Sequence, residues 1–289
     1  MDYLIYLLIV MCVYVILTVS LNSLVGEARI FSFAHAAFFG IGAYTAAILM
    51  VKAGWNFIPA AVAAFAVTSI IAALSGIPAL RLGGDYFVLA CFALQIIVER
   101  IFNNWESLTG GPYGLYGIPR PSLFGYVLTN NRIFLLLALM IAGLVIWVYG
   151  RWMKSPYGLT LRILGEDEVV AASMGRNLTR LKVTLFAITG GTAALSGALY
   201  AVLYGVVDPS AFGIHVIILL WAMLFVGGMG NLKGPILGAM VLLSLPEALR
   251  FIGIHGAKAG QVQQMAYGLF LIVAMLFRPQ GLAGEHRVE

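Results

Sequence analysis

The sequence predicts an all-α integral membrane protein, a polytopic bundle of about eight or nine transmembrane helices. Hydrophobic residues make up 62% of the 289 positions and charged residues only 10%, and the mean hydropathy is +0.98. A soluble domain is nearer ~45–50% apolar, and its helices would need polar faces that these segments lack. Stretches without Asp, Glu, Lys or Arg occur at 3–26, 30–51, 53–80, 86–98, 133–150, 183–207, 209–232, 234–246 and 259–277.

These stretches give the elements in order, within a single transmembrane domain over 1–289. The first is expected to stay in the protein as a helix, because no basic segment precedes it and it is longer than the apolar core of a signal peptide. Several others are long enough to span the hydrocarbon, which takes about 20 residues. The segments 86–98 and 234–246 reach that length only if Glu99 and Glu247 are tolerated near their ends.

The basic residues predict the orientation, since Lys and Arg are more frequent in cytoplasmic loops. With nine spans and the N-terminus outside, the cytoplasmic segments carry 11 basic residues and the outside segments carry 6. This places residues 151–182 and the C-terminus in the cytoplasm. The formal charge of +5 therefore reflects topology, and no nucleic-acid partner is expected because no clustered basic face is evident. The cytoplasmic set is Arg29, Arg81, Arg151, Lys154, Arg162, Arg176, Arg180, Lys182, Lys233, Arg278 and Arg287.

The segment 151–182 is a charged island in an apolar chain. Glu166–Glu168 are expected in the first turn of a short helix, where the helix dipole favours negative charge, and Gly175 can close its end. Val170 and Met174 would form a small apolar face. So short a helix needs a packing partner, which could be its own membrane domain or a cytoplasmic protein. The alternative is a solvated linker containing a stray helical turn.

A second polar feature lies on the helix expected around residues 86–105. Gln95, Glu99, Asn103 and Glu106 fall within an arc of about 80° on a helical wheel. Polar groups in a membrane helix usually face a cavity or a partner, so the stripe is predicted to face the translocation path or a subunit interface. Equally, it could be a helix end lying in water at the membrane surface.

Further candidates for the translocation path are His35 and two glycine-interrupted membrane segments. Gly40 and Gly42 follow His35, and Gly227 and Gly228 lie in the second half of the chain. Paired segments of this kind can mark a binding site between structural repeats, whereas tight helix packing is the alternative. The two cysteines, Cys12 and Cys91, are expected to be small buried side chains.

Motifs for chemistry are absent from the sequence. There is no GxxxxGK[ST] phosphate loop, no HExxH, no GxSxG and no spacing typical of metal ligands. The chain is therefore predicted to be no enzyme by itself, with no cofactor. Energy would come from another chain or from an ion gradient. This leaves an ATP-coupled permease, an ion-driven secondary transporter and a membrane enzyme as the classes to compare.

Five blocks of the sequence resemble a known family. They are "FSFAHAAFFGIGAYTAAIL" (31–49), "LTGGPYGLYGIPRP" (108–121), "SPYGLTLRILGEDEVVAASMGRNLTRLKV" (155–183), "FVGGMGNLKGPILGA" (225–239) and "LFRPQGLAG" (276–284). In this order they resemble the permease subunits of bacterial branched-chain amino acid ABC importers, more closely the LivM type. The sequence departs from the family pattern at "ARIFSFAHAAFF", with Arg29 and Phe31, and at "CFALQIIVER", where the acid is displaced to Glu99.

The resemblance implies a set of partners and a role for the charged island. Such permeases work with ATP-binding ABC subunits, a second homologous permease and an extracytoplasmic solute-binding protein, and they carry a small-molecule substrate across the lipid bilayer. Branched-chain amino acids are the first candidate substrate that the resemblance implies, and urea, amides or aromatic acids are the alternatives. By resemblance, the residues that couple to the ATPase are Arg162, Glu166, Asp167, Glu168, Ala171, Ala172 and Gly175.

Overall fold

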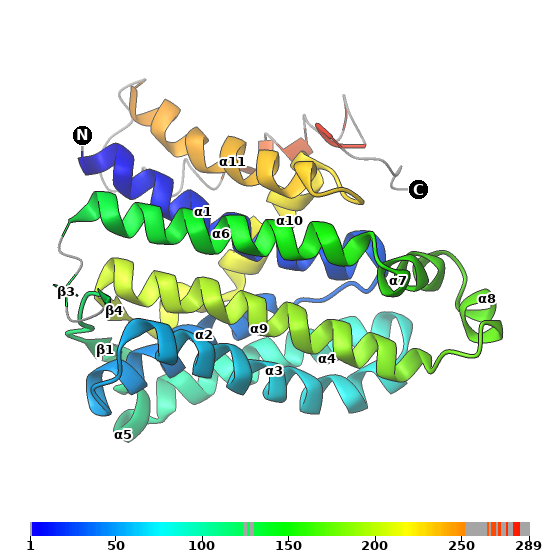
Figure 1. The fold of residues 1–289 in the computed structure, drawn as a ribbon, viewed down its shortest axis with the longest axis horizontal. Coiled ribbons are helices and arrows are strands. Elements are labelled where there is room, and N and C mark those ends of the chain that lie inside the picture. Colours follow the sequence, from blue (N-terminus) through cyan, green and yellow to red (C-terminus); the bar gives the residue numbers. More distant parts are fainter. Residues whose placement is uncertain are drawn as a thin grey trace.

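The computed structural model describes residues 2–123, 126–127, 130–251, 265, 267–269, 271–272, 276 and 280–283. Long helices run side by side along the length of the molecule (Figure 1). They are α1 (Asp2–Asn22), which continues as the π-helical turn η1 (Ser23–Glu27), α2 (His35–Lys52), α3 (Phe57–Leu82), α4 (Gly84–Asn104), α6 (Asn131–Met153), α9 (Leu178–Tyr204), α10 (Ile214–Gly227) and α11 (Lys233–Phe251).

The connections hold only short elements. The short helices are α5 (Glu106–Thr109), α7 (Pro156–Glu166) and α8 (Glu168–Ser173), with the 3₁₀ turns η2 (Gly111–Tyr113) and η3 (Pro209–Phe212). Strand β1 (Leu115–Tyr116) pairs antiparallel with β4 (Val206–Val207), Leu115 lying opposite Val207. Strand β2 (Ser122–Leu123) pairs antiparallel with β3 (Tyr126–Val127).

Six helical segments in the described part of the chain are long and apolar enough to cross a membrane. This confirms the predicted all-α membrane protein. Helices α4, with 21 residues, and α11, with 19, run alongside but are not among these six. The total of eight or nine spans stays a prediction, because 259–277 lies mostly outside the described residues. The six segments are Tyr3–Glu27, His35–Lys52, Phe57–Leu82, Asn131–Met153, Leu178–Tyr204 and Pro209–Gly227.

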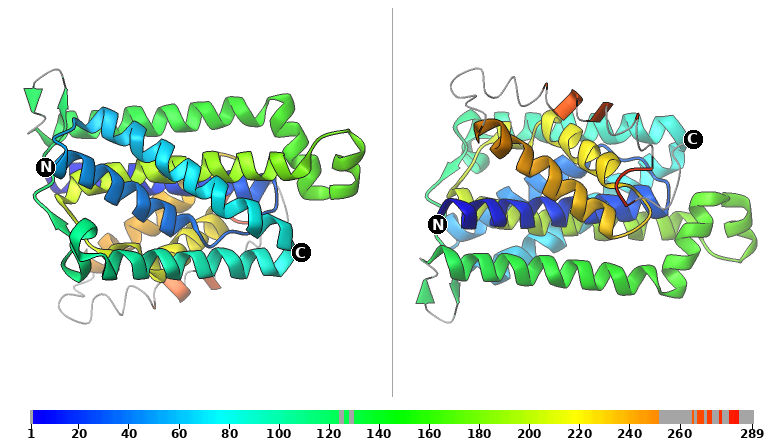
Figure 2. Two further views of the ribbon diagram at one scale, coloured as in Figure 1. Left: turned by 90° about the horizontal axis from the view of Figure 1, so that it is seen from below. Right: turned by 90° about the horizontal axis from the view of Figure 1, so that it is seen from above.

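The two ends of the bundle differ in structure. Helices α7 and α8 project from one end, whereas α5, β1 and β4 lie at the other end near the N-terminus (Figures 1 and 2). The charged segment 151–182 and the segment from α5 to β1 are therefore at opposite ends of the bundle (Figure 1).

Small residues allow the central helices to touch. Helix α9 packs against α1, α2 and α3. A Cβ added to Gly42 on α2 would overlap the backbone of Ala194 on α9, and one added to Gly197 on α9 would overlap the backbone of α2. Lipid tails are as apolar as Leu, so close van der Waals packing must replace the hydrophobic drive between membrane helices. Cys12 and Cys91 are buried and free, as predicted.

We expect Gly42→Ala to destabilise the protein, because the new methyl group meets backbone atoms that cannot rotate away. Overpacking of this kind costs about 1–3 kcal/mol. The measurement is the unfolding temperature in detergent. Gly143→Ala is the matched control, since that helical position in α6 has open space around it and Ala favours helix by about 1 kcal/mol. Equal unfolding temperatures for the two variants would contradict the role given to the α2–α9 contact.

Candidate functional site

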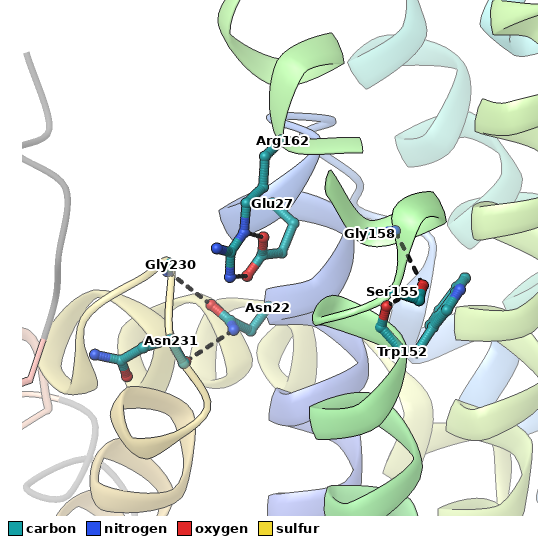
Figure 3. Close-up of polar contacts among 8 residues, drawn as sticks. All are labelled: Asn22, Glu27, Trp152, Ser155, Gly158, Arg162, Gly230 and Asn231. Carbon is teal, nitrogen blue, oxygen red and sulfur yellow. Dashed lines mark hydrogen bonds and ion pairs between the residues drawn. The ribbon is translucent and has the colours of Figure 1, made fainter. Parts of the chain in front are cut away.

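The charged segment begins with α7, whose start is fixed by a side-chain cap. The Ser155 hydroxyl accepts a hydrogen bond from the Gly158 N–H at 3.3 Å and donates one to the Trp152 carbonyl (Figure 3). Pro156 occupies the first helical turn, where its missing N–H costs nothing. These contacts turn the chain sharply from the end of α6 into α7.

A break between α7 and α8 separates the three acidic residues Glu166–Glu168. The prediction that all three lie in the first turn of one helix is therefore wrong. Glu166 ends α7, and Asp167 adopts an extended conformation with φ −151° and ψ 111°. The Asp167 carboxylate accepts hydrogen bonds from the N–H groups of Val169 and Val170 at 2.7 and 3.2 Å. Asp is a strong N-cap because its side chain satisfies N–H groups that have no partner within the helix. Asp167 therefore starts α8, and only Glu168 lies in its first turn.

Helix α8 is held from one side and exposed on the other. Ala171 is fully buried, and Glu168 forms an ion pair with Lys182 at the start of α9. Val170 is 50% exposed, and Met174, just after the helix, is 52% exposed. The predicted apolar face of Val170 and Met174 is therefore half exposed, and the neighbouring Val169 is 78% exposed. The neighbouring Ala172 is also exposed.

A glycine, Gly175, ends the turn that follows α8, as predicted. Gly175 has φ +70°, a left-handed conformation that Gly adopts without steric cost. The chain then enters α9, where the Asn177 side chain accepts a hydrogen bond from the Arg180 N–H at 3.0 Å. Tyr157 on α7 donates its hydroxyl to the Leu181 carbonyl at 3.0 Å. Burial raises the pKa of Tyr157, so this hydroxyl remains a neutral donor.

An ion pair attaches α7 to the end of the first helix. The Arg162 guanidinium donates to both carboxylate oxygens of Glu27, with the Nη2–Oε1 distance at 3.3 Å (Figure 3). The Glu27 side chain is only 4% exposed, whereas that of Arg162 is 48% exposed. Beside the pair, a Cβ on Gly165 would stand 2.7 Å from the Glu27 carbonyl oxygen. We call this contact, made by Glu27, Arg162 and Gly165, the α1–α7 clamp.

The end of α1 also holds the turn between α10 and α11. Asn22 donates its side-chain N–H to the Asn231 carbonyl at 3.0 Å and accepts from the Gly230 N–H at 3.3 Å (Figure 3). Gly230 has φ +93°, which favours glycine. The end of the first helix, from Asn22 to Glu27, is thus bonded both to α7 and to the glycine-rich turn at 228–232.

The four glycines proposed for the translocation path each have a local reason to be glycine. A Cβ on Gly42 would overlap Ala194, and one on Gly227 would overlap the backbone of Gly234 at the α10–α11 crossing. Gly228 ends α10 with φ +98°. A Cβ on Gly40 would stand 2.8 Å from the ring of Phe102 and 3.0 Å from that of Phe212. Close packing accounts for glycine at positions 40, 42 and 227, and backbone conformation accounts for it at position 228.

The polar path candidates have different environments. Gln95 is buried and donates its side-chain N–H to the Phe212 carbonyl at 2.7 Å, which joins α4 to η3. Its side-chain oxygen and both ring nitrogens of the buried His35 have no hydrogen-bond partner among the described residues. Glu99 lies one turn after Gln95 and is half-buried, whereas Glu106 is exposed in α5. The predicted stripe therefore runs from the interior of the bundle to its surface. Through Phe212, the structure brings Gly40 and Gln95 together.

Sequence reasoning did not single out Glu27, Asn22 or Trp221. Glu27 is the only acidic residue between Asp2 and Asp85, and that isolation at the end of an apolar stretch is the signal that could have found it. Trp221 packs between the rings of Phe31 and Phe33, at centroid distances of 5.7 and 5.4 Å. No local pattern indicates this contact. Within the described residues, no group of three His, Cys, Asp or Glu side chains is placed to hold a metal ion.

The sequence is similar to known transport proteins over nearly its whole length. The profile of the family described as branched-chain amino acid transport system, permease component, matches residues 3–277. The high-affinity branched-chain amino acid transport system permease protein LivM of Salmonella typhimurium is 31% identical over 93% of this chain, which spans 67% of that relative's length.

More distant relatives match over both full chains. The permease protein BraD of Pseudomonas aeruginosa is 25% identical over 96% of this chain and 93% of its own length. The permease protein LivH of Escherichia coli is 23% identical over 96% and 92%. No solved structure matches the chain. On its sequence match from residue 3 to residue 277, the chain belongs to the permease-component family of branched-chain amino acid transport systems.

Proposed function

We propose that this chain is the membrane permease subunit of an ATP-driven importer of branched-chain amino acids. It would lie in a bacterial plasma membrane as one domain, with 151–182 and the C-terminus in the cytoplasm. Its partners would be ATP-binding subunits, a second homologous permease and an extracytoplasmic binding protein. The observation that carries the proposal is α8, an anchored helix whose Val169, Val170 and Met174 side chains are exposed. Exposed apolar groups on a short charged helix suit a groove on another protein.

The contacts of α7 and α8 suggest how movement of an ATPase would reach the membrane helices. A force on α8 is transmitted to α7 and, through Lys182, to α9. The α1–α7 clamp passes it to α1, and Asn22 passes it to the α10–α11 turn. ATP binding in a partner can bias the permease only if the partner contacts the two conformational states of the permease differently. The ion pairs and hydrogen bonds just named would carry that difference from α8 to the membrane helices. Their predicted members remain Arg162, Glu166–Glu168, Ala171, Ala172 and Gly175.

For the translocation path we propose the neighbourhood of Gln95, His35 and Glu99. Buried polar atoms without partners are costly in a membrane protein, and they mark places where a polar solute or water can bind. Gln95 and His35 carry such atoms. Gly40 would let η3 approach α2 and α4 closely there, while Gly42, Gly227 and Gly228 would set the helix spacing.

Reconstitution in liposomes tests the function as a whole. With the ATPase subunits, second permease and binding protein present, we expect ATP-dependent concentrative uptake of leucine, isoleucine or valine. The chain alone should neither hydrolyse ATP nor move solute, because its sequence has no phosphate-binding loop. Uptake by the lone chain driven by a proton or sodium gradient would instead indicate a secondary transporter. Urea, amides and aromatic acids are the alternative solutes to supply in the same assay.

Cysteine labelling tests both the orientation and the docking of α8. In a background with Cys12→Ala and Cys91→Ala, Val169→Cys should resist an impermeant maleimide in intact cells and react in inverted vesicles. Bound ATPase subunits should slow this reaction by about tenfold or more, as burial in an interface does. Tyr113 is 78% exposed in η2, just before β1, which lies at the opposite end (Figure 1). Tyr113→Cys is the matched control and should react in intact cells. Ready labelling of Val169→Cys from outside, or no protection by the ATPase, would refute the assignment.

Arg162→Gln tests the α1–α7 clamp. It leaves the Glu27 carboxylate buried without its charged partner, which costs about 3–5 kcal/mol in fully buried pairs and less here because Arg162 is half exposed. We expect substrate-stimulated ATP hydrolysis by the assembled importer to fall about tenfold, which corresponds to ~1.4 kcal/mol. Arg180→Gln, at an exposed position on the same segment, should have little effect.

A double variant separates the charge imbalance from the contact itself. Glu27→Gln with Arg162→Gln removes both charges, so the unfolding temperature should recover relative to Arg162→Gln alone. Stimulated ATP hydrolysis should stay low, because a neutral pair holds α7 less firmly. Full recovery of hydrolysis in the double variant would show that the clamp serves stability only.

A further inference from the structure

An open basic cavity lies beside the clamp, at the end of the bundle that carries α7. Its volume is about 560 Å³, and it is formed by the end of α6, by α7 and by the α10–α11 turn. The lining residues that matter for its chemistry are Trp147, Arg151, Lys154, Arg162, Asn231 and Lys233. Among the residues that the structure describes, no acidic side chain lines it.

The positive charge in this cavity is incompletely balanced. Arg162 is neutralised by Glu27, which lies behind it. Arg151, Lys154 and Lys233 are exposed, and within the described ranges none of the three has an acidic partner at ion-pair distance. Three cations around one hollow repel one another unless an anion binds between them. The cavity thus favours a ligand with at least one negative charge and several hydrogen-bond acceptors.

A row of exposed apolar side chains runs along one face of α6 and ends at this cavity. Leu136, Met140, Leu144 and Trp147 follow one another at helical spacing on one face, and Arg151 continues the same face. The four apolar side chains are 58%, 63%, 59% and 65% exposed. Trp is enriched where the hydrocarbon meets the headgroups. An acyl chain lying along this row would therefore end at the cationic cavity.

We propose that the cavity binds the headgroup of an anionic phospholipid, with its phosphate between Arg151, Lys154 and Lys233. The acyl chain would lie along the outward face of α6, where Leu136, Met140 and Leu144 are exposed. Basic hollows between membrane helices recognise lipid headgroups through this combination of charge and apolar continuity. Because the lipid would join the end of α6, which leads into α7, to the start of α11, it would brace segments next to those that the clamp and Asn22 connect. This inference does not depend on which solute the permease carries.

The test is lipid binding to the purified, detergent-solubilised chain by native mass spectrometry. Dioleoylphosphatidylglycerol is titrated against the zwitterionic dioleoylphosphatidylcholine. We expect phosphatidylglycerol to be retained more tightly, and we expect Arg151→Gln/Lys154→Gln/Lys233→Gln to weaken it by about tenfold or more, since each basic residue near a lipid surface contributes to attraction. Arg81→Gln/Arg176→Gln/Arg180→Gln removes three exposed charges elsewhere and should leave binding unchanged.

The outcomes separate the lipid from other occupants. An unchanged unfolding temperature in phosphatidylcholine would show that the triple variant at Arg151, Lys154 and Lys233 is folded. The single change Lys154→Gln should give an intermediate loss of lipid binding. Equal retention of the two lipids, or equal effects of the two triple variants, would overturn the proposal. Displacement of the lipid by millimolar inorganic phosphate would identify a site for soluble anions. Displacement by added ATPase subunits would assign the cavity to a protein interface.

Discussion

The ion pair between Glu27 and Arg162 is the constraint on which the candidate site depends. The Glu27 side chain is only 4% exposed, burial of a charged group is costly unless the group is paired, and Arg can bind both oxygens of a carboxylate at once. This contact holds α7 against the end of α1. Together with the Ser155 cap of α7 and the Asp167 cap of α8, it sets where α8 presents its exposed side chains. Gly165 is required at the same place, because any larger residue would push α7 away from the Glu27 carbonyl.

The transmembrane bundle provides a firm base for this contact through a different kind of interaction. Around α9, the close approaches are made by Gly42, Gly197 and their Ala neighbours, not by charge. Such packing is short-ranged and rigid, so α1, α2, α3 and α9 behave as one block. The polar contacts are concentrated at the end of α1, where Asn22 and Glu27 each join a different segment. Motion is easier to accommodate there than within the glycine-packed centre.

The sequence could predict the membrane bundle because long apolar stretches determine helices directly. It also predicted the charged helical segment and the left-handed Gly175, since local capping signals suffice for both. It placed Glu166–Glu168 in one turn, because nothing local distinguishes Asp167 as a cap from Asp167 as a first-turn residue. The Glu27–Arg162 pair spans 135 positions, and Trp221 meets Phe31 and Phe33 from a distant helix. Contacts of this kind depend on how helices pack, which one sequence does not encode locally.

In the coupling role that we propose, the exposure of α8 and the burial of Glu27 serve one purpose. A docking helix that packed fully on its own domain would have no surface for a partner, and one held loosely would move without moving the membrane helices. Here the side chains proposed to face the partner, such as Val169, are exposed, whereas α7 is anchored through the buried Glu27 carboxylate, both of whose oxygens accept hydrogen bonds from Arg162. A buried pair is weak evidence for stability, because desolvation offsets the attraction, but it specifies one geometry. For an element proposed to transmit movement between two proteins, a fixed geometry matters more than added stability. Movement of α7 at a loose α1–α7 clamp would not reach the helices of the translocation path.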